Sequence, residues 1–255
     1  MRIDGAVVLL TGASSGIGAA TAPLLAERGA RLLLAGRDRD ALAAAAERCG
    51  GQVLAADLAD PGATERLAAE ALACHGRVDL LINNAGAGWA GPLAEMALDR
   101  AARLVALNLL APMALARLLL PGMLERRHGH LVFVTSIAGV TGVGGEAVYA
   151  AAKGGLATFA ASLREELSGR GVGISLVVPG VVATPFFDRR GTPYARTWPR
   201  PIAPERVAAA LLRAVESDRA EVFAPAWMRF PARLAGSAPA LYRTLAIRFG
   251  ATRPS

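Results

Sequence analysis

The stretch Thr11-Gly12-Ala13-Ser14-Ser15-Gly16-Ile17-Gly18 decides the fold of this chain. It follows the apolar run 6–10, which predicts a buried strand, and leads into an Ala- and Leu-rich segment with helical spacing that ends near Gly29. A strand, a glycine-rich turn and a helix N-terminus in this order can hold a pyrophosphate on free backbone N–H groups. A tight turn that binds nothing is the alternative. The spacing differs from G-x-G-x-x-G, because three residues separate the first two glycines.

The next predicted strand, 31–35, is followed by Gly36, Arg37 and Asp38. Dinucleotide-binding folds often place an acidic residue here to hold the adenosine ribose. Gly36 instead leaves room, and Arg37 offers a guanidinium that suits a 2′-phosphate. Asp38 comes one residue late and is predicted to cap the following helix. The pattern favours the phosphorylated cofactor, although Arg37 could also be one more exposed arginine.

The chain contains a single lysine, Lys153, which lies four residues after Tyr149. Residues four apart share a face of a helix, and an ammonium beside a phenol favours the phenolate. We therefore expect the pKa of Tyr149 to be lowered, so that this residue donates a proton near neutral pH. A surface lysine beside a half-buried tyrosine is the alternative for this pair alone.

Several motifs follow one another along the chain. They are Thr11 to Gly18, Asp57, Asn83-Asn84-Ala85-Gly86, Asn108, Ser136, Tyr149 with Lys153, and Pro179-Gly180 followed by Thr184. This ordered set resembles the short-chain dehydrogenase/reductase family, and the resemblance extends to about Ala224. It implies a single-domain, Rossmann-like oxidoreductase that moves a hydride between a nicotinamide and a carbonyl or alcohol. Gly36 departs only from members that use the non-phosphorylated cofactor.

The resemblance implies four catalytic residues, Asn108, Ser136, Tyr149 and Lys153. Tyr149 would donate a proton to the substrate oxygen, and Ser136 would orient and polarise the carbonyl. Lys153 would tune the phenol and bind the nicotinamide ribose, with a water linking it toward Asn108. Taken alone, Asn108 could be satisfied within its own helix and Ser136 could be a cap.

The resemblance also implies the cofactor contacts for NADP(H). The pyrophosphate and the adenosine side would be surrounded by Gly12, Ser14, Ser15, Ile17 and Gly18, and Ser14 would reach a 2′-phosphate beside Arg37. The adenine would lie at Asp57 and Leu58, and the adenosine ribose along Asn84, Ala85 and Gly86. The nicotinamide would lie at Pro179, Gly180, Val182 and Thr184, together with Tyr149 and Lys153.

Length and composition favour one α/β domain over residues 1–255. Of the 255 residues, 53% are hydrophobic, which is enough for a large core. Strands are predicted near 6–10, 31–35, 52–55, 78–82, 130–135, 173–178 and 221–224, and each except the last is followed by a helical stretch. We expect a Rossmann-like, doubly wound parallel sheet of about seven strands with helices on both faces. A basic C-terminal extension would cover about 226–255.

The sequence gives little support for a secreted, membrane-spanning, metal-binding or nucleic-acid-binding protein. We expect no signal peptide, no apolar run long enough to span a membrane, and a cytoplasmic location. Cys49 and Cys74 are predicted to be ordinary helical residues, and the three histidines share no ligand spacing, so no metal site is expected. The net charge is +7, but the arginines are scattered without a recognisable reading element, so nucleic-acid binding is not expected.

The substrate is predicted from the segment 183–203, which contains Phe186, Phe187, Tyr194 and Trp198; Trp89 follows the Asn-Asn-Ala-Gly turn. These aromatic side chains suit an apolar, bulky carbonyl or alcohol compound, or they form a lid packed on itself. A 3-oxoacyl thioester reductase and a non-catalytic NADP-binding sensor are the alternative functions.

The tail has an unusual charge. Residues 222–255 contain five arginines and no Asp or Glu, so they carry +5 of the formal +7. A helix is predicted to start at Ser237-Ala238-Pro239. Apolar stripes are formed by Trp227, Phe230 and Leu234, and by Tyr242, Leu245 and Phe249 before Gly250. The tail could contact an anionic membrane peripherally, or pack on the substrate cleft or a second subunit, since the resemblance implies a homo-oligomer, either a dimer or a tetramer.

Overall fold

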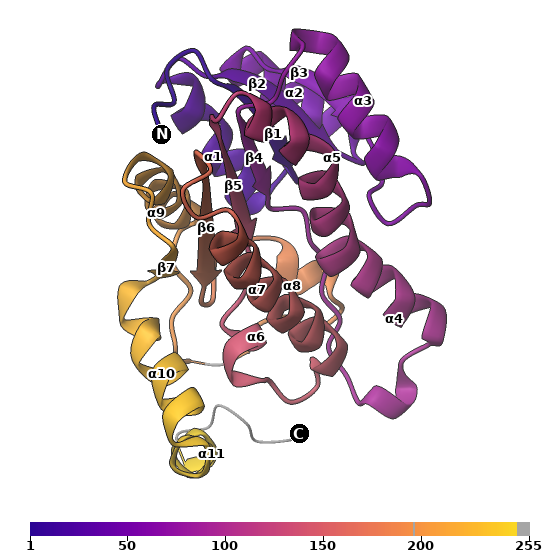
Figure 1. Cartoon of the computed structure of the whole chain (residues 1–255). Coiled ribbons are helices and arrows are strands. Elements are labelled where there is room, and N and C mark those ends of the chain that lie inside the picture. The colour runs from indigo at the N-terminus through magenta and orange to yellow at the C-terminus, as the bar shows by residue number, and fades with distance from the viewer. Residues whose placement is uncertain (196, 249–255) are drawn as a thin grey trace.

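A computed structural model of the chain describes residues 1–195 and 197–248 and contains a parallel sheet of seven strands (Figure 1). The strands are β1 (Val7–Thr11), β2 (Arg31–Gly36), β3 (Gln52–Ala55), β4 (Leu80–Asn83), β5 (Gly129–Val134), β6 (Val172–Pro179) and β7 (Glu221–Ala224). Their order in the sheet is β3-β2-β1-β4-β5-β6-β7, and neighbouring strands run parallel. Each predicted strand corresponds to one of these, so the predicted fold class is confirmed.

Helices cover both faces of the sheet (Figure 1). One face carries α1 (Gly16–Ala26), α2 (Arg39–Cys49) and α9 (Pro204–Glu216); the other carries α3 (Ala63–His75), α5 (Ala111–Glu125) and α7 (Ala147–Glu166). Helix α4 (Leu98–Val105) is joined to α5 by the π-helical turn η2 (Ala106–Leu110), and short 3-10 turns lie at η1 (Leu93–Glu95) and η3 (Ala226–Met228). Helices α6 (Ala138–Thr141), α8 (Phe186–Arg189), α10 (Arg229–Ser237) and α11 (Pro239–Arg248) lie beyond the carboxyl edge of the sheet.

The two faces of β1 show why its sequence is apolar throughout. Val8 and Leu10 belong to the core under α1, α2 and α9, whereas Val7 and Leu9 belong to the core under α3, α5 and α7. All five residues of the strand are buried. A central parallel strand is covered on both sides, so it lacks the alternation of a half-exposed strand.

The position of the site follows from the strand order. The chain turns back between β3 and β4, so that β1 and β4 become neighbours at the middle of the sheet. In open α/β sheets, ligands bind beyond the carboxyl ends of the strands at such a switch point. The glycine stretch follows β1 directly, and the Asn-Asn-Ala-Gly turn begins at the end of β4.

The helical run Leu98–Glu125 contains an 18-residue window with a mean hydropathy of 1.8 and is long and apolar enough to cross a membrane by length and composition. The expectation that no apolar run reaches this length was therefore wrong. Leu115, Ala116, Leu119 and Met123 of this run pack against the sheet, which accounts for its apolar composition.

Other local predictions agree with the structure. Asp38 caps α2, because its Oδ1 accepts from Ala41 N at 3.0 Å. Cys49 and Cys74 lie on α2 and α3 as predicted. Helix α11 begins at Pro239. Phe249, Gly250 and Arg253 lie outside the described residues.

Candidate active site

The glycine turn after β1 leaves no space for side chains at two positions. A Cβ added at Gly18 would lie 2.1 Å from the carbonyl oxygen of Gly12. One added at Gly12, which has a φ of +68°, would lie 2.9 Å from the Cα of Ala85. The backbone therefore closes tightly at the start of α1, as a pyrophosphate site requires.

A threonine and an asparagine tie this turn to the neighbouring strand. Thr11 Oγ1 donates to Ile82 O at 3.2 Å and accepts from Asn84 N and Ala85 N at 3.0 Å each. Asn84 Nδ2 donates to Thr11 O at 3.0 Å and to Gly12 O at 3.2 Å. The Asn84 side chain thus holds the turn. The role of Thr11 as its partner was missed, although a threonine closing the strand was visible in the sequence.

The structure brings together the residues predicted for the adenosine end. A Cβ added at Gly36 would lie 3.7 Å from Ser14 Oγ, so the space beside Gly36 is bordered by that hydroxyl. Arg37 is exposed and has no ion-pair partner in the part of the chain that the structure describes. This arrangement leaves a guanidinium and a hydroxyl beside an open glycine. Ile17 packs at the edge of the core under α1.

Asp57 follows β3, and its carboxylate is already engaged. Its Oδ1 accepts from Ala59 N at 3.0 Å, and its Oδ2 accepts from Arg103 on α4 at 2.9 Å. Arg103 also binds Asp60, so it bridges two carboxylates. Leu58 beside it is buried.

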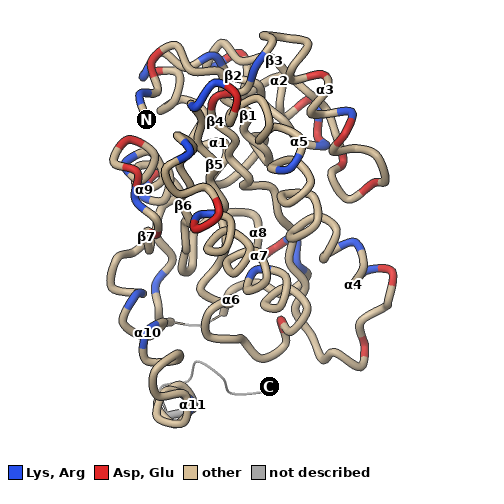
Figure 2. The backbone as a smooth tube through the Cα atoms, viewed as in Figure 1, with Lys and Arg blue, Asp and Glu red and all other residues tan. Residues whose placement is uncertain are grey.

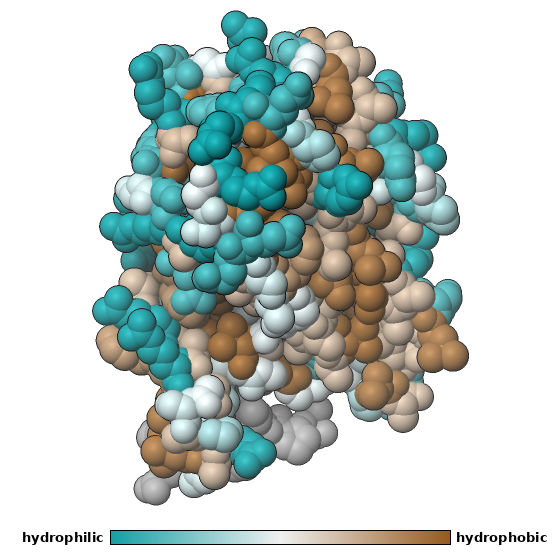
Figure 3. Space-filling model, in the orientation of Figure 1, coloured by the Kyte–Doolittle hydropathy of each residue, from teal (hydrophilic) through white to brown (hydrophobic). Residues whose placement is uncertain are grey.

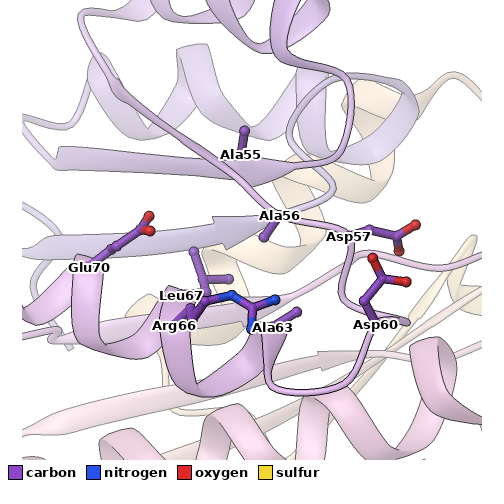
Figure 4. A pocket seen from close by; sticks show the side chains of 8 residues that line it. All are labelled: Ala55, Ala56, Asp57, Asp60, Ala63, Arg66, Leu67 and Glu70. Atoms are coloured by element: carbon purple, nitrogen blue, oxygen red, sulfur yellow. The ribbon is translucent and has the colours of Figure 1, made fainter.

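A small cavity of about 150 Å³ lies next to this segment, between the end of β3 and α3 (Figure 4). Asp57 and Asp60 lie at one side of it and Glu70 at the other, with Arg66 between them (Figure 4). None of the predicted catalytic residues lines this cavity, so we assign it no part in the reaction.

Two glycines bring the catalytic elements α6 and α7 together. A Cβ added at Gly139 on α6 would lie 2.7 Å from the backbone of Lys153 and of Gly154 on α7. This close backbone contact sets Ser136, which lies just before α6, beside Tyr149, and the two side chains are hydrogen-bonded. This contact between α6 and α7 was not predicted from the sequence, although Gly139 and Gly154 lie close to the two motifs.

Tyr149 is 7% exposed, and burial raises the pKa of its phenol above the ordinary value. The hydrogen bond with Ser136 and the charge of Arg190 lower this pKa, while Glu146 raises it, and burial dominates. The expected lowering of the Tyr149 pKa was therefore wrong in direction. The phenol stays protonated at neutral pH, which is the form that a proton donor needs.

Lys153 is 4% exposed, and burial lowers the pKa of its ammonium to about 8. Its Nζ donates to Val134 O at 3.0 Å and lies 6.0 Å from the centroid of the Tyr149 ring. The lysine and the tyrosine share a face of α7 as predicted, but the ammonium points to the end of β5 and does not set the pKa of the phenol.

Asn108 lies in the π-helical turn η2 and is completely buried. Its Nδ2 donates to Leu104 O and to Ala87 O, at 2.9 Å each, whereas its Oδ1 accepts from no donor among the described residues. A Cβ added at Gly86 would meet Asn108 Oδ1 at 2.8 Å and Lys153 Nζ at 3.4 Å. The free amide oxygen and the ammonium therefore border the same small space.

The predicted nicotinamide residues lie at the end of β6 and in the segment that follows it. Pro179 O accepts from Ile137 N at 2.9 Å, which ties the end of β6 to the segment after Ser136. A Cβ added at Gly16 would lie 3.0 Å from Thr184 Cγ2, so Thr184 reaches the glycine turn. Gly180 follows β6, and Val182 is buried.

Helix α8 forms a lid over Tyr149, the predicted proton donor. The ring of Phe186 lies 5.5 Å from that of Tyr149, and a Cβ added at Gly88 would meet Phe186 at 2.6 Å. Phe187 packs on Phe186 with 5.6 Å between ring centroids, and Tyr194 packs on Phe187 at 5.2 Å. The lid is thus partly packed on its own aromatics, while Phe186 reaches the site itself.

Two consecutive arginines fasten this lid. Arg189 donates to Ser15 Oγ at 2.9 Å, which joins α8 to the glycine turn. Arg190 forms an ion pair with Glu146 at the start of α7, and its guanidinium lies 4.7 Å from the ring of Phe187. The side chains of the ion pair are 9% and 13% exposed. Neither contact was predicted from the sequence.

The described residues contain no group of three or more His, Cys, Asp or Glu side chains that could hold a metal ion. The described site places a buried phenol, a hydroxyl, an ammonium and an amide close to the glycine turn.

Comparisons with known proteins agree with this geometry. A model of the short chain dehydrogenase family matches residues 6–194. Dehydrogenase/reductase SDR family member 7B of Mus musculus is 36% identical over 188 residues, which are 70% of this chain and 58% of that protein. The match thus spans little more than half of the mouse protein. The 3-oxoacyl-(acyl-carrier-protein) reductase FabG of Escherichia coli (strain K12) is 35% identical over 186 residues, 72% of this chain and 76% of that protein.

Solved structures extend the similarity to nearly the whole chain. A short-chain dehydrogenase from Sphingobium yanoikuyae in complex with NADPH has a TM-score of 0.81 and 30% identity, covering 92% of this chain and 94% of that one. A short chain dehydrogenase/reductase from Burkholderia phymatum in complex with NAD has a TM-score of 0.85 and 25% identity, covering 100% and 99%. The family model covers well over half of the sequence and the family's motifs meet at one site, so the chain belongs to the short-chain dehydrogenase/reductase family.

Proposed function

We propose that this protein is an NADP(H)-dependent oxidoreductase that transfers a hydride between the nicotinamide and the carbonyl or alcohol carbon of an apolar small molecule. The observation that carries this proposal is the meeting of Ser136, Tyr149, Lys153 and Asn108 beside a glycine turn closed too tightly for side chains. A cofactor-binding sensor would have no need of this assembled proton donor.

The residues divide the work of carbonyl reduction. When bound, the nicotinamide cofactor supplies the hydride. Tyr149 donates its hydroxyl proton to the carbonyl oxygen, which Ser136 orients and polarises by a hydrogen bond. Lys153, whose ammonium donates to Val134 O and lies 6.0 Å from the centroid of the Tyr149 ring, would bind the nicotinamide ribose. The Tyr149 phenolate is reprotonated from solvent, and Asn108 Oδ1 offers an acceptor that would hold a water beside the Lys153 ammonium for this transfer.

The preference for NADP(H) is supported by Gly36, Ser14 and Arg37. An unpaired guanidinium and a nearby hydroxyl suit a 2′-phosphate, and Gly36 presents no carboxylate to repel it. The variant Gly36→Asp/Arg37→Ser should shift the preference toward NAD, because it adds a ribose acceptor and removes the counter-charge. Titrations of both cofactors by protein fluorescence measure the shift. Equal affinity of the unmodified protein for NADP and NAD would refute this preference.

The substrate is proposed to be apolar because Phe186 packs on Tyr149 and the adjoining lid is aromatic. A 3-oxoacyl thioester is the second candidate, and it is favoured by the similarity to the Escherichia coli 3-oxoacyl-(acyl-carrier-protein) reductase. Turnover of NADPH across a panel of ketones, aldehydes, steroids and acyl thioesters separates the two substrate classes.

The variant Tyr149→Phe tests the enzymatic proposal. It removes one hydroxyl from a buried ring, so it should fold and bind NADPH normally while turnover falls by about a hundredfold or more. Cofactor titration provides the control for folding. Turnover close to that of the unmodified protein would exclude Tyr149 as the proton donor.

Location in the cytoplasm and assembly into a homodimer or homotetramer are further parts of this proposal. Size-exclusion chromatography with light scattering tests the assembly, and a monomer at micromolar concentration would refute it.

A further inference from the structure

A cluster of exposed aromatic side chains lies where the lid segment meets the tail. Trp198 is 61% exposed, Phe230 is 60% exposed and Trp227 is 38% exposed. The rings of Trp198 and Trp227 stack at 5.1 Å with an interplanar angle of 27°. Phe230 follows Trp227 by three residues at the start of α10, and Arg229 lies over its ring at 5.0 Å. We call this cluster, together with Arg229 and Arg233, the tail surface.

The charge around the tail surface is mostly positive. Residues 222–248 contain four arginines and no Asp or Glu, and residues 189–203 likewise contain no acid. Figure 2 shows basic positions without acidic ones along α10, whereas both colours alternate along α3 and α9. Glu221, just before this segment, is within electrostatic range of Arg233. The tail surface is therefore basic as well as aromatic.

The tail surface lies close to the elements that carry the candidate site residues. Helix α10 packs against α6, which follows Ser136. A Cβ added at Gly180 would lie 2.7 Å from Met228 Cε, so the turn before α10 contacts the predicted nicotinamide side of the crevice. Trp198 belongs to the same segment as the aromatic lid. A binding partner that covered the tail surface would therefore lie next to the candidate site.

The apolar side chains of the tail that are exposed in the structure differ from the stripe predicted from the sequence. Tyr242 and Leu245, predicted to form a stripe on α11, are half-buried, and Ala246 beside them is buried. Helix α11 packs on α10, so this stripe faces the protein. Figure 3 shows hydrophobic and strongly hydrophilic residues side by side over α10 and α11. The large apolar side chains that are exposed within residues 222–248 are instead Trp227 and Phe230 of the tail surface and Leu241, which is 51% exposed.

We propose that the tail surface binds an anionic lipid membrane peripherally. Tryptophan and phenylalanine side chains insert at the boundary between headgroups and acyl chains, and arginines bind the phosphates of anionic lipids. The absence of acids in residues 222–248 fits a negatively charged partner. Such binding would place the mouth of the site against the bilayer, where lipophilic substrates concentrate. This last consequence rests on the proposed function, whereas the binding itself does not.

Sedimentation of the full chain with lipid vesicles tests the proposal. Vesicles of phosphatidylcholine alone are compared with vesicles of equal parts phosphatidylcholine and phosphatidylglycerol, at low and high salt. We expect binding to the anionic vesicles only, and weaker binding at high salt. The variant Arg229→Gln/Arg233→Gln should bind about thirtyfold more weakly, since each basic residue near an anionic surface contributes about fivefold. Phe230→Ser should also weaken binding.

Matched controls make the result specific. Arg48→Gln/Arg213→Gln removes two exposed charges from α2 and α9, and Leu98→Ser removes an exposed apolar side chain from α4. Both should bind vesicles like the unmodified protein. Turnover of a water-soluble carbonyl compound should be unchanged in every variant, so failure of the proposed enzymatic function would be seen separately. Absence of vesicle binding, equal loss in the controls, or dissociation of an oligomer by Phe230→Ser without vesicle binding would overturn the proposal.

Discussion

Acidification should destabilise this protein through His130, a buried histidine far from the catalytic residues along the sheet. His130 is 1% exposed, and its Nε2 lies 2.9 Å from Ser175 Oγ, which donates its own proton to Arg219 O at 2.7 Å. The ring therefore donates from Nε2 as a neutral imidazole. Burial lowers the pKa of His130 to about 4; the positive N-terminus and Arg164 add to this lowering, and Asp218 opposes it.

The magnitude follows from the difference between the folded and unfolded pKa of His130. Above about pH 6.5, the imidazole is neutral in both states and contributes no pH dependence. Between about pH 6.5 and the folded pKa of about 4, the unfolded chain binds a proton that the folded protein does not, so stability falls with falling pH. The full difference corresponds to a loss of about 3 kcal/mol, which is a substantial part of the stability of a typical domain.

Urea unfolding between about pH 7 and about pH 4 measures this loss, with the variant His130→Gln as the comparison. Carboxylates also titrate in this range, but they contribute equally to both proteins, so the difference in slope isolates the histidine. His128→Gln, at an exposed histidine, serves as the matched control. If His130→Gln lost stability on acidification as steeply as the unmodified protein, the burial argument would be refuted.

Two further substitutions test the catalytic helix and the lid. Lys153→Arg should lower turnover about a hundredfold despite keeping the charge, because a planar guanidinium is too large for the buried site of the ammonium. Steady-state kinetics with NADPH measure the turnover, and a normal rate would contradict the prediction. Glu146→Gln should destabilise the protein by about 3 kcal/mol and raise KM, because it leaves Arg190 buried without its counter-charge and frees the lid. Urea unfolding measures the loss of stability, and substrate titration measures KM. An unchanged KM would exclude the lid contact from substrate binding.

Much of the fold could be predicted because its signals are local. The strands are short apolar runs, and the cap at Asp38 depends on the four consecutive positions 38–41. The predicted site residues also lie at strand ends, so the parallel arrangement alone brings Gly12, Asn84 and Ser136 to one edge of the sheet. For these residues, the order of elements is sufficient information.

The electrostatics of the site could not be predicted in the same way. Spacing places Tyr149 and Lys153 on one face of α7, but it does not report how deeply they are buried. In the structure, burial raises the pKa of the phenol and lowers that of the ammonium, which outweighs their attraction. Likewise, the stripe containing Tyr242 and Leu245 has a periodicity that suits either a partner or the protein's own surface, and the packing of α11 on α10 decides for the latter.

The lid shows how contacts distant in sequence can join the two halves of the site. Arg189 reaches Ser15 in the glycine turn, and Arg190 reaches Glu146 at the start of the catalytic helix, so adjacent residues contact the cofactor side and the catalytic side. Phe186 between these contacts packs on Tyr149. Because α8 and the residue directly after it carry all three contacts, displacing this segment would break them together. Under the function proposed above, this segment would therefore couple access to the glycine turn with access to Tyr149.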